Sequence, residues 1–235
     1  MAADMKKLFE AGAHFGHKTS RWNPKMREYI HSKAGEIHVI DLAKTADAIE
    51  ESQKFLEKVA ANGKQILFVG TKKQAQEIAK TAAESTNNPY VINRWVGGML
   101  TNTNTVLSQI KKLKNLEKRM DSGELAAKYN KLEVQRYQEE IDSLEFKYGG
   151  IKDLHGKLGA VVIFSAADDH NAVLEAAKLG VPAIAIVDTN ADPTEVKFPI
   201  PANDDAISAL TVISDYLVEA VKAGQTKATK ESDAK

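Results

Sequence analysis

The sequence changes pattern at RWVGGMLTNTN, residues 94–104. Before this stretch, short apolar runs alternate with longer amphipathic segments, which predicts strands alternating with helices. After it, residues 105–148 show helical periodicity and no strand signal, and the alternation resumes near Gly159. Strand–helix alternation is typical of a parallel sheet with helices on its faces. We therefore predict an α/β domain that is interrupted by a helical insertion.

Near-continuous apolar runs predict strands of the parallel kind, which are buried on both faces. The clearest are at 65–69, 160–164 and 182–187. Asp41 suits the N-cap of a following helix, because its carboxylate accepts hydrogen bonds from free backbone amides. Shorter strands are expected at 37–40, 90–92 and 196–201, and helices at 4–13, 42–61, 72–85, 169–179 and from 203 or 204 to 221.

The insertion has its own periodicity. Apolar residues recur at spacings of three and four over 106–120 and again over 134–148. This seven-residue repeat predicts an antiparallel coiled-coil hairpin. Cations concentrate on its first helix and carboxylates on its second, and we expect them to be solvated or to pair across the hairpin. Glu117 falls at an apolar position of the repeat, which predicts a local weakness in the helix pairing.

The predicted domain boundaries follow from these patterns. Residues 1–104 and 149–225 form the α/β domain, and residues 105–148 form the inserted hairpin. The tail, 226–235, is rich in lysine and lacks large apolar residues. Such a segment cannot bury enough apolar surface to offset the entropy lost on ordering, so we expect it to be disordered.

Composition excludes several classes of protein. The 235 residues contain no cysteine, so no disulfide framework, thiolate metal site or thiol nucleophile forms. No apolar run approaches the ~18 residues that a membrane span needs, and no apolar signal core follows the first residues; we expect a cytoplasmic protein without membrane contact. The net charge is zero, yet residues 1–35 carry seven Lys and Arg against three acidic residues, and residues 149–225 carry five against eleven. This asymmetry predicts two kinds of partner.

Cations and aromatic residues are interleaved in segment 14–29, where Gly16 and Pro24 prevent one regular element. Cations bind phosphates and aromatic rings stack on bases, so we predict that this segment contacts RNA. The alternative is a solvated loop whose rings pack on the domain. Its two histidines also suggest a metal site, but no third ligand lies at a useful spacing and we predict none. The candidate RNA-binding residues are His14, His17, Lys18, Arg21, Trp22, Asn23, Lys25 and Arg27.

The stretch 94–104 supplies a second candidate RNA contact. It combines a cation, an indole, two glycines that permit a tight turn, and small polar residues that donate to phosphates. The alternative is a plain loop with Trp95 in the core. The candidate residues are Arg94, Trp95, Gly97, Gly98, Thr101, Asn102 and Asn104.

Lys72 and Lys73 form a third candidate feature. They stand where strand 65–69 passes through Gly70 into a helix, and such a helix start is a natural anion site. Neither G-x-x-x-x-G-K-[ST] nor G-x-G-x-x-G is present, so neither nucleotide fingerprint is met. We expect these lysines to meet an RNA phosphate or only water.

Carboxylates follow the predicted strands of the second half, at the edge where ligands of α/β sheets bind. They could chelate a cation or receive a basic partner, although caps and turns are the favoured roles for these residue types. Ser165 is not followed by the glycine turn of an activated nucleophile. We predict no catalytic set and no cofactor. The carboxylates are Asp168, Asp169, Asp188, Asp192, Asp204 and Asp205.

Taken together, these motifs resemble the family of the second protein of the small ribosomal subunit, in its bacterial form. The similarity extends over roughly residues 5–222. The matching pieces are LFEAGAHFGH at 8–17, RWNPKM at 21–26, IHVIDL at 37–42, ILFVGTK at 66–72, RWVGGMLTN at 94–102, GGI at 149–151, IVDTN at 186–190 and IPANDDAI at 200–207.

The resemblance implies a flavodoxin-like (Rossmann-like) three-layer sandwich with a protruding coiled-coil arm. It implies a structural constituent of the small (30S) subunit that binds ribosomal RNA where head meets body. It also implies help in docking the first small-subunit protein for translation, and no catalysis. One departure is Ser165, where the family commonly places an aspartate. We expect protein partners at Asp188, Asp192, Asp204 and Asp205.

An alternative interpretation remains open at this stage. The same sheet could serve an enzyme or a binding module for a phosphorylated small ligand.

Overall fold

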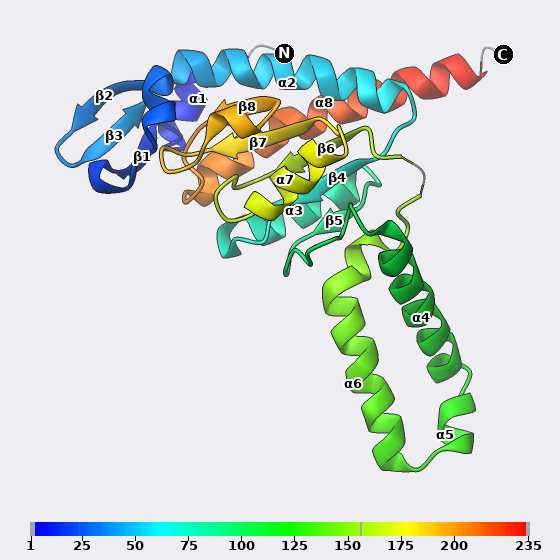
Figure 1. Cartoon of the computed structure of the whole chain (residues 1–235). Coiled ribbons are helices and arrows are strands. Elements are labelled where there is room, and N and C mark those ends of the chain that lie inside the picture. Colours follow the sequence, from blue (N-terminus) through cyan, green and yellow to red (C-terminus); the bar gives the residue numbers. More distant parts are fainter. Residues whose placement is uncertain (1–2, 156, 234–235) are drawn as a thin grey trace.

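The computed structural model describes residues 3–155 and 157–233. Its centre is a five-stranded sheet in the order β5-β4-β6-β7-β8 (Figure 1). All four pairings are parallel. In chain order this is the 2-1-3-4-5 arrangement of flavodoxin-like folds, so the predicted α/β class and parallel sheet are confirmed. The strands are β4 (Ile66–Val69), β5 (Tyr90–Val91), β6 (Ala160–Ile163), β7 (Ala183–Val187) and β8 (Phe198–Pro201).

Both faces of this sheet are buried, which explains why its central strands are apolar throughout. Successive residues of a strand point to opposite faces. Ile66 and Phe68 therefore join one core cluster, whereas Leu67 and Val69 join the other. The first cluster packs against α1 (Met5–Glu10), α2 (Leu42–Ala61), α3 (Lys73–Ser85) and α8 (Ile207–Asp233), and the second against α7 (His170–Lys178) and the base of the insertion.

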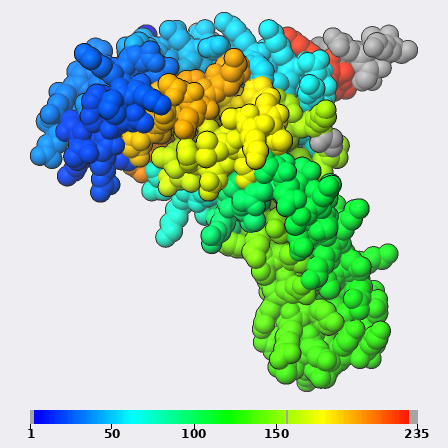
Figure 2. All heavy atoms as spheres, viewed as in Figure 1, coloured from blue at the N-terminus to red at the C-terminus, as the bar shows by residue number. Residues whose placement is uncertain are grey.

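The insertion is a helical hairpin that projects from the α/β body (Figures 1 and 2). It consists of α4 (Thr103–Asp121), the short α5 (Glu124–Lys128) at the far end, and α6 (Lys131–Tyr148). Gly123 follows α4 with a φ of +73°, a left-handed conformation that glycine adopts readily. Lys112 of α4 pairs with Glu140 of α6, as charges across the hairpin were expected to do. Knobs-into-holes packing of a coiled coil stays a prediction.

The apolar seam of α4 differs from the expected repeat at one position. Leu116 is buried, whereas Glu117 is half-buried and its carboxylate lies 2.6 Å from the Lys152 ammonium. Lys152 also pairs with Glu145 of α6. Glu117 therefore lies beside the seam and anchors the hairpin base, so the expected weak point there is wrong.

The N-terminal region forms a second, antiparallel sheet in the order β1-β3-β2. Its strands are β1 (Phe15–Lys18), β2 (Ile30–Ala34) and β3 (Ile37–Ile40), with two 3-10 helices, η1 (Thr19–Arg21) and η2 (Pro24–Tyr29), between β1 and β2. The predicted strand at 37–40 is thus present, but it is not part of the parallel sheet. Sequence gave no signal for β2, because four of its five residues are exposed and largely polar.

The C-terminal helix is longer than expected. α8 continues to Asp233, so residues 226–233, for which disorder was expected, are helical in the structure, and residues 234–235 lie outside the described part of the chain. Contacts with the body explain the difference. The Gln225 amide donates to the Thr86 carbonyl at 2.6 Å, and Lys227 pairs with Glu57 of α2. Gly224 lies so close to α2 that a Cβ there would be 2.3 Å from the Glu57 carbonyl oxygen.

Both outer strands of the parallel sheet are short or interrupted. β5 contains two residues, and β8 has the sequence Phe-Pro-Ile-Pro. Proline has no backbone N–H to donate, so it is tolerated on edge strands and not inside a sheet. None of the helices in the described ranges is long and apolar enough to span a membrane.

Candidate nucleic-acid interface

Loop 94–102 folds around one carboxylate, that of Glu175 on α7. Glu175 accepts hydrogen bonds from the Trp95 indole nitrogen at 3.0 Å and from the backbone amides of Gly98, Leu100 and Thr101 at 2.7, 3.0 and 3.1 Å. The Thr101 hydroxyl donates as well, at 3.1 Å. Burial opposes the charged form of Glu175, but these donors outweigh it and hold the pKa of its carboxyl below the ordinary value.

Trp95 is a core residue in this arrangement. Its side chain is 9% exposed and belongs to the cluster on the α7 face of the sheet. The alternative arrangement, a loop with Trp95 in the core, is the one observed, and RNA contact by Trp95 stays a prediction.

The remaining candidates of this loop lie at the surface. Gly98 has a φ of +87°, a left-handed conformation that glycine adopts readily and that lets the backbone turn tightly at the Glu175 carboxylate. The side chains of Arg94, Thr101, Asn102 and Asn104 and the backbone at Gly97 are exposed. The loop thus exposes one cation and several small polar groups, while the Trp95 side chain holds it in the core.

Segment 14–29 lies against the carboxyl end of β7. The Thr189 hydroxyl accepts from the His17 amide at 2.8 Å, and the Thr189 carbonyl accepts from the Asn23 amide at 2.7 Å. Asn23 in turn accepts from the Lys25 amide and begins η2. A Cβ at Gly16 would lie 2.6 Å from a Thr189 side-chain carbon. These contacts fix the segment on the parallel sheet.

The cations of segment 14–29 differ in whether a carboxylate of the chain pairs with them. Lys25 pairs with Asp192, and this hydrogen bond raises the pKa of the Lys25 ammonium. Lys18 has a distant partner, Glu36, at 3.9 Å. Arg21 and Arg27 are exposed. Within residues 3–155 and 157–233, no carboxylate pairs with either arginine.

The aromatic residues of this segment are less enclosed than Trp95. Trp22 is half-buried, and its ring centroid lies 5.0 Å from that of His38. His14 is packed between Phe9 and Phe15, with centroids 4.5 and 4.0 Å away, and burial lowers the pKa of its imidazole. His14 is therefore part of an aromatic cluster, and its contact with RNA stays a prediction.

Lys72 lies at the carboxyl end of the parallel sheet within a group of aspartates. Its ammonium is 2.7 Å from a carboxylate oxygen of Asp204, 2.7 Å from one of Asp205 and 3.7 Å from one of Asp168. Burial lowers the pKa of Lys72, but the hydrogen bonds to Asp204 and Asp205 outweigh it and raise the value. Lys72 is balanced within the chain, whereas Lys73, the first residue of α3, is exposed.

Two of the four aspartates predicted to meet protein partners are buried. Asp188 and Asp204 are each 1% exposed, so in this structure their carboxylates face other groups of the chain, and their contact with a protein partner stays a prediction. Asp188 lies 3.1 Å from the His17 imidazole and accepts from the Thr189 amide. Asp192 is paired with Lys25, and only Asp205 keeps a largely exposed side chain.

Ser165, the departure from the family pattern, takes part in the same network. Its hydroxyl lies 2.6 Å from a carboxylate oxygen of Asp204 and 3.1 Å from one of Asp168. Asp169 accepts from the Thr71 hydroxyl at 2.8 Å, and burial raises the pKa of its carboxyl to about 6. Ser165 therefore orders the turn after β6 by linking the carboxylates of Asp168 and Asp204.

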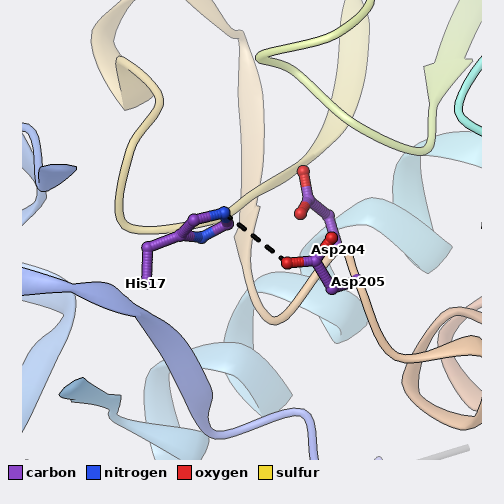
Figure 3. A group of neighbouring side chains, drawn as sticks. All are labelled: His17, Asp204 and Asp205. Carbon is purple, nitrogen blue, oxygen red and sulfur yellow. Dashed lines mark ion pairs between the residues drawn. The ribbon is translucent and has the colours of Figure 1, made fainter.

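One group of side chains has the donor types of a metal site. His17, Asp204 and Asp205 each offer a ligand atom, and these atoms lie within 4.8 Å of one another (Figure 3). Imidazole and carboxylate are ligands that suit zinc. The Lys72 ammonium already contacts both carboxylates. His14, which the sequence paired with His17, does not belong to the group.

Comparison with known protein families decides the assignment. The family described as Ribosomal protein S2 matches residues 8–224. The chain belongs to this family.

Membership in the Ribosomal protein S2 family supports a structural role in the ribosome. It points away from enzymatic activity, and it implies a small-subunit protein of translation that is associated with the ribosome. The match includes both segment 14–29 and loop 94–102. Family similarity therefore covers the whole candidate interface described above.

Sequence reasoning missed Glu175. It is an acid within the apolar run of α7, and it follows buried Ala172 and Val173 by three and two positions. A residue three positions from a buried one shares its helix face. This placement was the one signal that the carboxylate faces inward.

Proposed function

We propose that this chain binds small-subunit ribosomal RNA through the outward side chains of segment 14–29 and loop 94–102. We propose further that it does so where head meets body and helps dock the first small-subunit protein. One observation supports the RNA contact most directly. Arg21, Arg27, Lys73 and Arg94 are exposed, and none pairs with a carboxylate in the described ranges. Unbalanced cations on fixed supports suit phosphates.

The two segments are held by connected elements. α7 anchors loop 94–102 through Glu175, and its first residue, His170, lies 2.8 Å from Glu195 of η4 (Pro193–Glu195). Next to Glu195, Thr194 accepts from the Lys25 ammonium at 3.2 Å. A rigid connection of this kind keeps phosphate contacts at fixed spacing, which reduces the entropy lost on binding folded RNA.

The alternative, a binding module for a phosphorylated ligand, is not favoured. In this fold the ligand would lie at the carboxyl ends of β4 and β6, neighbouring strands whose following helices, α3 and α7, cover opposite faces of the sheet. That position holds Thr71 bonded to Asp169, and Lys72 bonded to Asp204. The lysine that would bind a phosphate is already balanced, and the surrounding acids would repel the anion.

The domain organisation is also a proposal. We infer that residues 1–104 and 149–225 fold without the hairpin 105–148. Replacing the hairpin by a short glycine–serine linker should lower stability, because Val106 and Ile110 pack in the core at its base; each buried apolar side chain contributes about 1.5–3 kcal/mol. Cooperative melting should nevertheless persist. A broad, non-cooperative transition would contradict this organisation.

The main test is incorporation into ribosomes. Tagged chain expressed in cells should co-sediment with small subunits through a sucrose gradient, and high salt should release it only slowly. Crosslinking in the purified subunits should then join residues near Arg21 and Arg94 to ribosomal RNA. Recovery of the chain only at the top of the gradient would overturn the proposal.

A further inference from the structure

A cavity of about 620 Å³ lies at the amino ends of the parallel strands. The residues that immediately precede β6 and β7, Gly159 and Pro182, line it, as does Lys64 before β4. It is therefore at the opposite end of the sheet from the aspartates and Lys72. Its volume is within the range of about 300–1,000 Å³ that is usual for sites receiving compact ligands or side chains.

The walls of this cavity are mainly apolar and come from separate parts of the chain. They include Val59 of α2, Leu100 of the loop around Glu175, and Leu154, Leu158, Leu179 and Val181. Leu179, which follows α7, is 50% exposed at the rim. Apolar surface that stays open in a recess, with polar residues around it, is typical of a place where another molecule binds.

The charges around the cavity all have one sign. Lys58, Lys64 and Lys157 line it, and no aspartate or glutamate does. All three lysines are exposed. Within residues 3–155 and 157–233, none of them has a carboxylate partner. Lys157 belongs to residues 149–225, which as a whole carry more acid than base, so its place in this group of lysines is not a consequence of the segment's overall charge.

We propose that this cavity docks an acidic amphipathic segment of a neighbouring protein in the small subunit. Apolar side chains of that segment enter the recess, and its carboxylates meet the three lysines at the rim. This inference rests on the proposed function, since it requires that the chain work within an assembly. It adds a protein contact on the end of the sheet away from segment 14–29.

RNA fits this cavity less well than a peptide does. Phosphates are bound by exposed cations and need no apolar recess. Bases need an open aromatic face, and the one aromatic residue of the lining, Phe55, is stacked on Phe198 with ring centroids 4.6 Å apart. A peptide with leucine-like anchors and acidic neighbours satisfies both features of the site.

Two leucines of the α7 region provide a matched test. Leu179 is 50% exposed and lines the cavity, whereas Leu174 is 46% exposed and does not. The variants Leu179→Asp and Leu174→Asp are incorporated into small subunits in cells, and the protein content of purified subunits is quantified by mass spectrometry. We expect Leu179→Asp to reduce one neighbouring protein about tenfold, because an unpaired carboxylate is costly in an apolar site. Leu174→Asp should leave the full complement.

Charge reversal at the rim provides a second variant. Lys157→Glu should reduce the same neighbour, because it places like charges together, and it leaves the apolar walls intact. If subunits do not incorporate Leu179→Asp, the test rests on Lys157→Glu. Its subunits should contain less of the neighbouring protein than those with Leu174→Asp. A full protein complement in subunits that contain Lys157→Glu or Leu179→Asp would overturn the inference.

A photo-crosslinking residue at position 179 identifies the occupant directly. The expected product joins position 179 to a peptide that contains both acidic and large apolar residues, and position 174 gives no such product. Crosslinking of position 179 to RNA, or to no component, would overturn the inference. Absence of every variant from small subunits would instead refute the proposed function, so the two failures are distinguishable.

Discussion

Two arginine–tryptophan pairs of this protein have the same sequence and opposite environments. Arg21-Trp22 lies in segment 14–29, where Trp22 is half-buried beside a histidine. Arg94-Trp95 lies in the loop around Glu175, where Trp95 is 9% exposed and donates to that carboxylate. The difference teaches that composition alone does not tell a half-buried surface tryptophan from one that is packed in the core. The half-buried carboxylate of Glu175, distant in sequence, accepts a hydrogen bond from Trp95 and has no counterpart at Trp22 in the described part of the chain.

Removing each tryptophan should give the largest contrast between the two pairs. Trp95→Ala should cost about 3–5 kcal/mol of unfolding free energy, as large-to-small core substitutions do. Trp22→Ala should cost about 0.5–1.5 kcal/mol, which is typical of losing one aromatic contact. Urea denaturation followed by circular dichroism measures both. Equal losses would show that the two environments do not differ as described.

Fluorescence refines the same comparison, because the chain has only two tryptophans. In Trp22→Phe the remaining indole is Trp95, which should resist acrylamide quenching. In Trp95→Phe the remaining indole should be quenched readily, and RNA should protect it if segment 14–29 is a contact.

Removing the carboxylate at position 175 should have the next largest effect. Glu175→Ala leaves the Trp95 indole and three backbone amides without their acceptor, and unpaired buried donors cost about 1–3 kcal/mol each. Solvent can reach part of this site, so we expect a total of about 2–4 kcal/mol. Glu175→Gln keeps one acceptor oxygen and should lose less. Glu77→Gln, an exposed acid of α3, is the control and should change nothing measurable.

The pH dependence of the Glu175 contribution has a definite sign. The pKa of Glu175 is lowered in the folded protein, so its ionised form stabilises the fold. That stabilisation should be complete above the ordinary value of 4.5 and should disappear as pH falls through the lowered folded pKa. The stability difference between wild type and Glu175→Gln should therefore shrink below about pH 4. A difference that grows on acidification would contradict the assignment.

Charge reversal in segment 14–29 should affect binding and leave stability intact. Arg21→Glu combined with Arg27→Glu should weaken association with small-subunit RNA and lower the salt slope by about 2, since each lost phosphate contact contributes about 1. The melting temperature should stay near that of wild type, because both side chains are exposed. Lys54→Glu on α2 is the matched control. Unchanged RNA binding of the double variant would contradict the proposal that segment 14–29 is part of the interface.

The smallest expected effect concerns His17, which fixes segment 14–29 on the sheet. The hydrogen bond with Asp188 raises the pKa of the His17 imidazole, although burial opposes the shift. Its stabilising contribution is therefore complete below the ordinary value of 6.5 and is lost as pH rises through the raised one. Denaturation of wild type and His17→Gln should differ more at about pH 5.5 than at about pH 9.

The sheet and its helices could be predicted from sequence for a local reason. Strands buried on both faces leave continuous apolar runs, and β4, β6 and β7 are such strands. The start of α2 was equally clear, because Asp41 accepts from the Ala43 amide at 3.0 Å, two residues away. Both patterns are local: the residues that determine each strand or helix start are within a few positions of it in the sequence.

The candidate site was harder to predict because its contacts are distant in sequence. Glu175 and Gly98 are 77 positions apart, and Lys72 and Asp204 are 132 apart. Such pairs leave no periodic pattern, so Lys72 was indistinguishable from a free phosphate contact and Asp204 from an exposed one. The exposure of Arg21, Arg27, Lys73 and Arg94 was predictable, because no carboxylate in the described part of the chain pairs with them.

The outer strands of the parallel sheet affect how readily unassembled copies of the chain associate with one another. An open β edge presents unpaired backbone groups on which another copy of the chain can pair. The prolines of β8 remove two of the donors that such stacking requires, and β5 is too short to align a partner. The two edge strands of the sheet thus protect the unassembled chain against self-association.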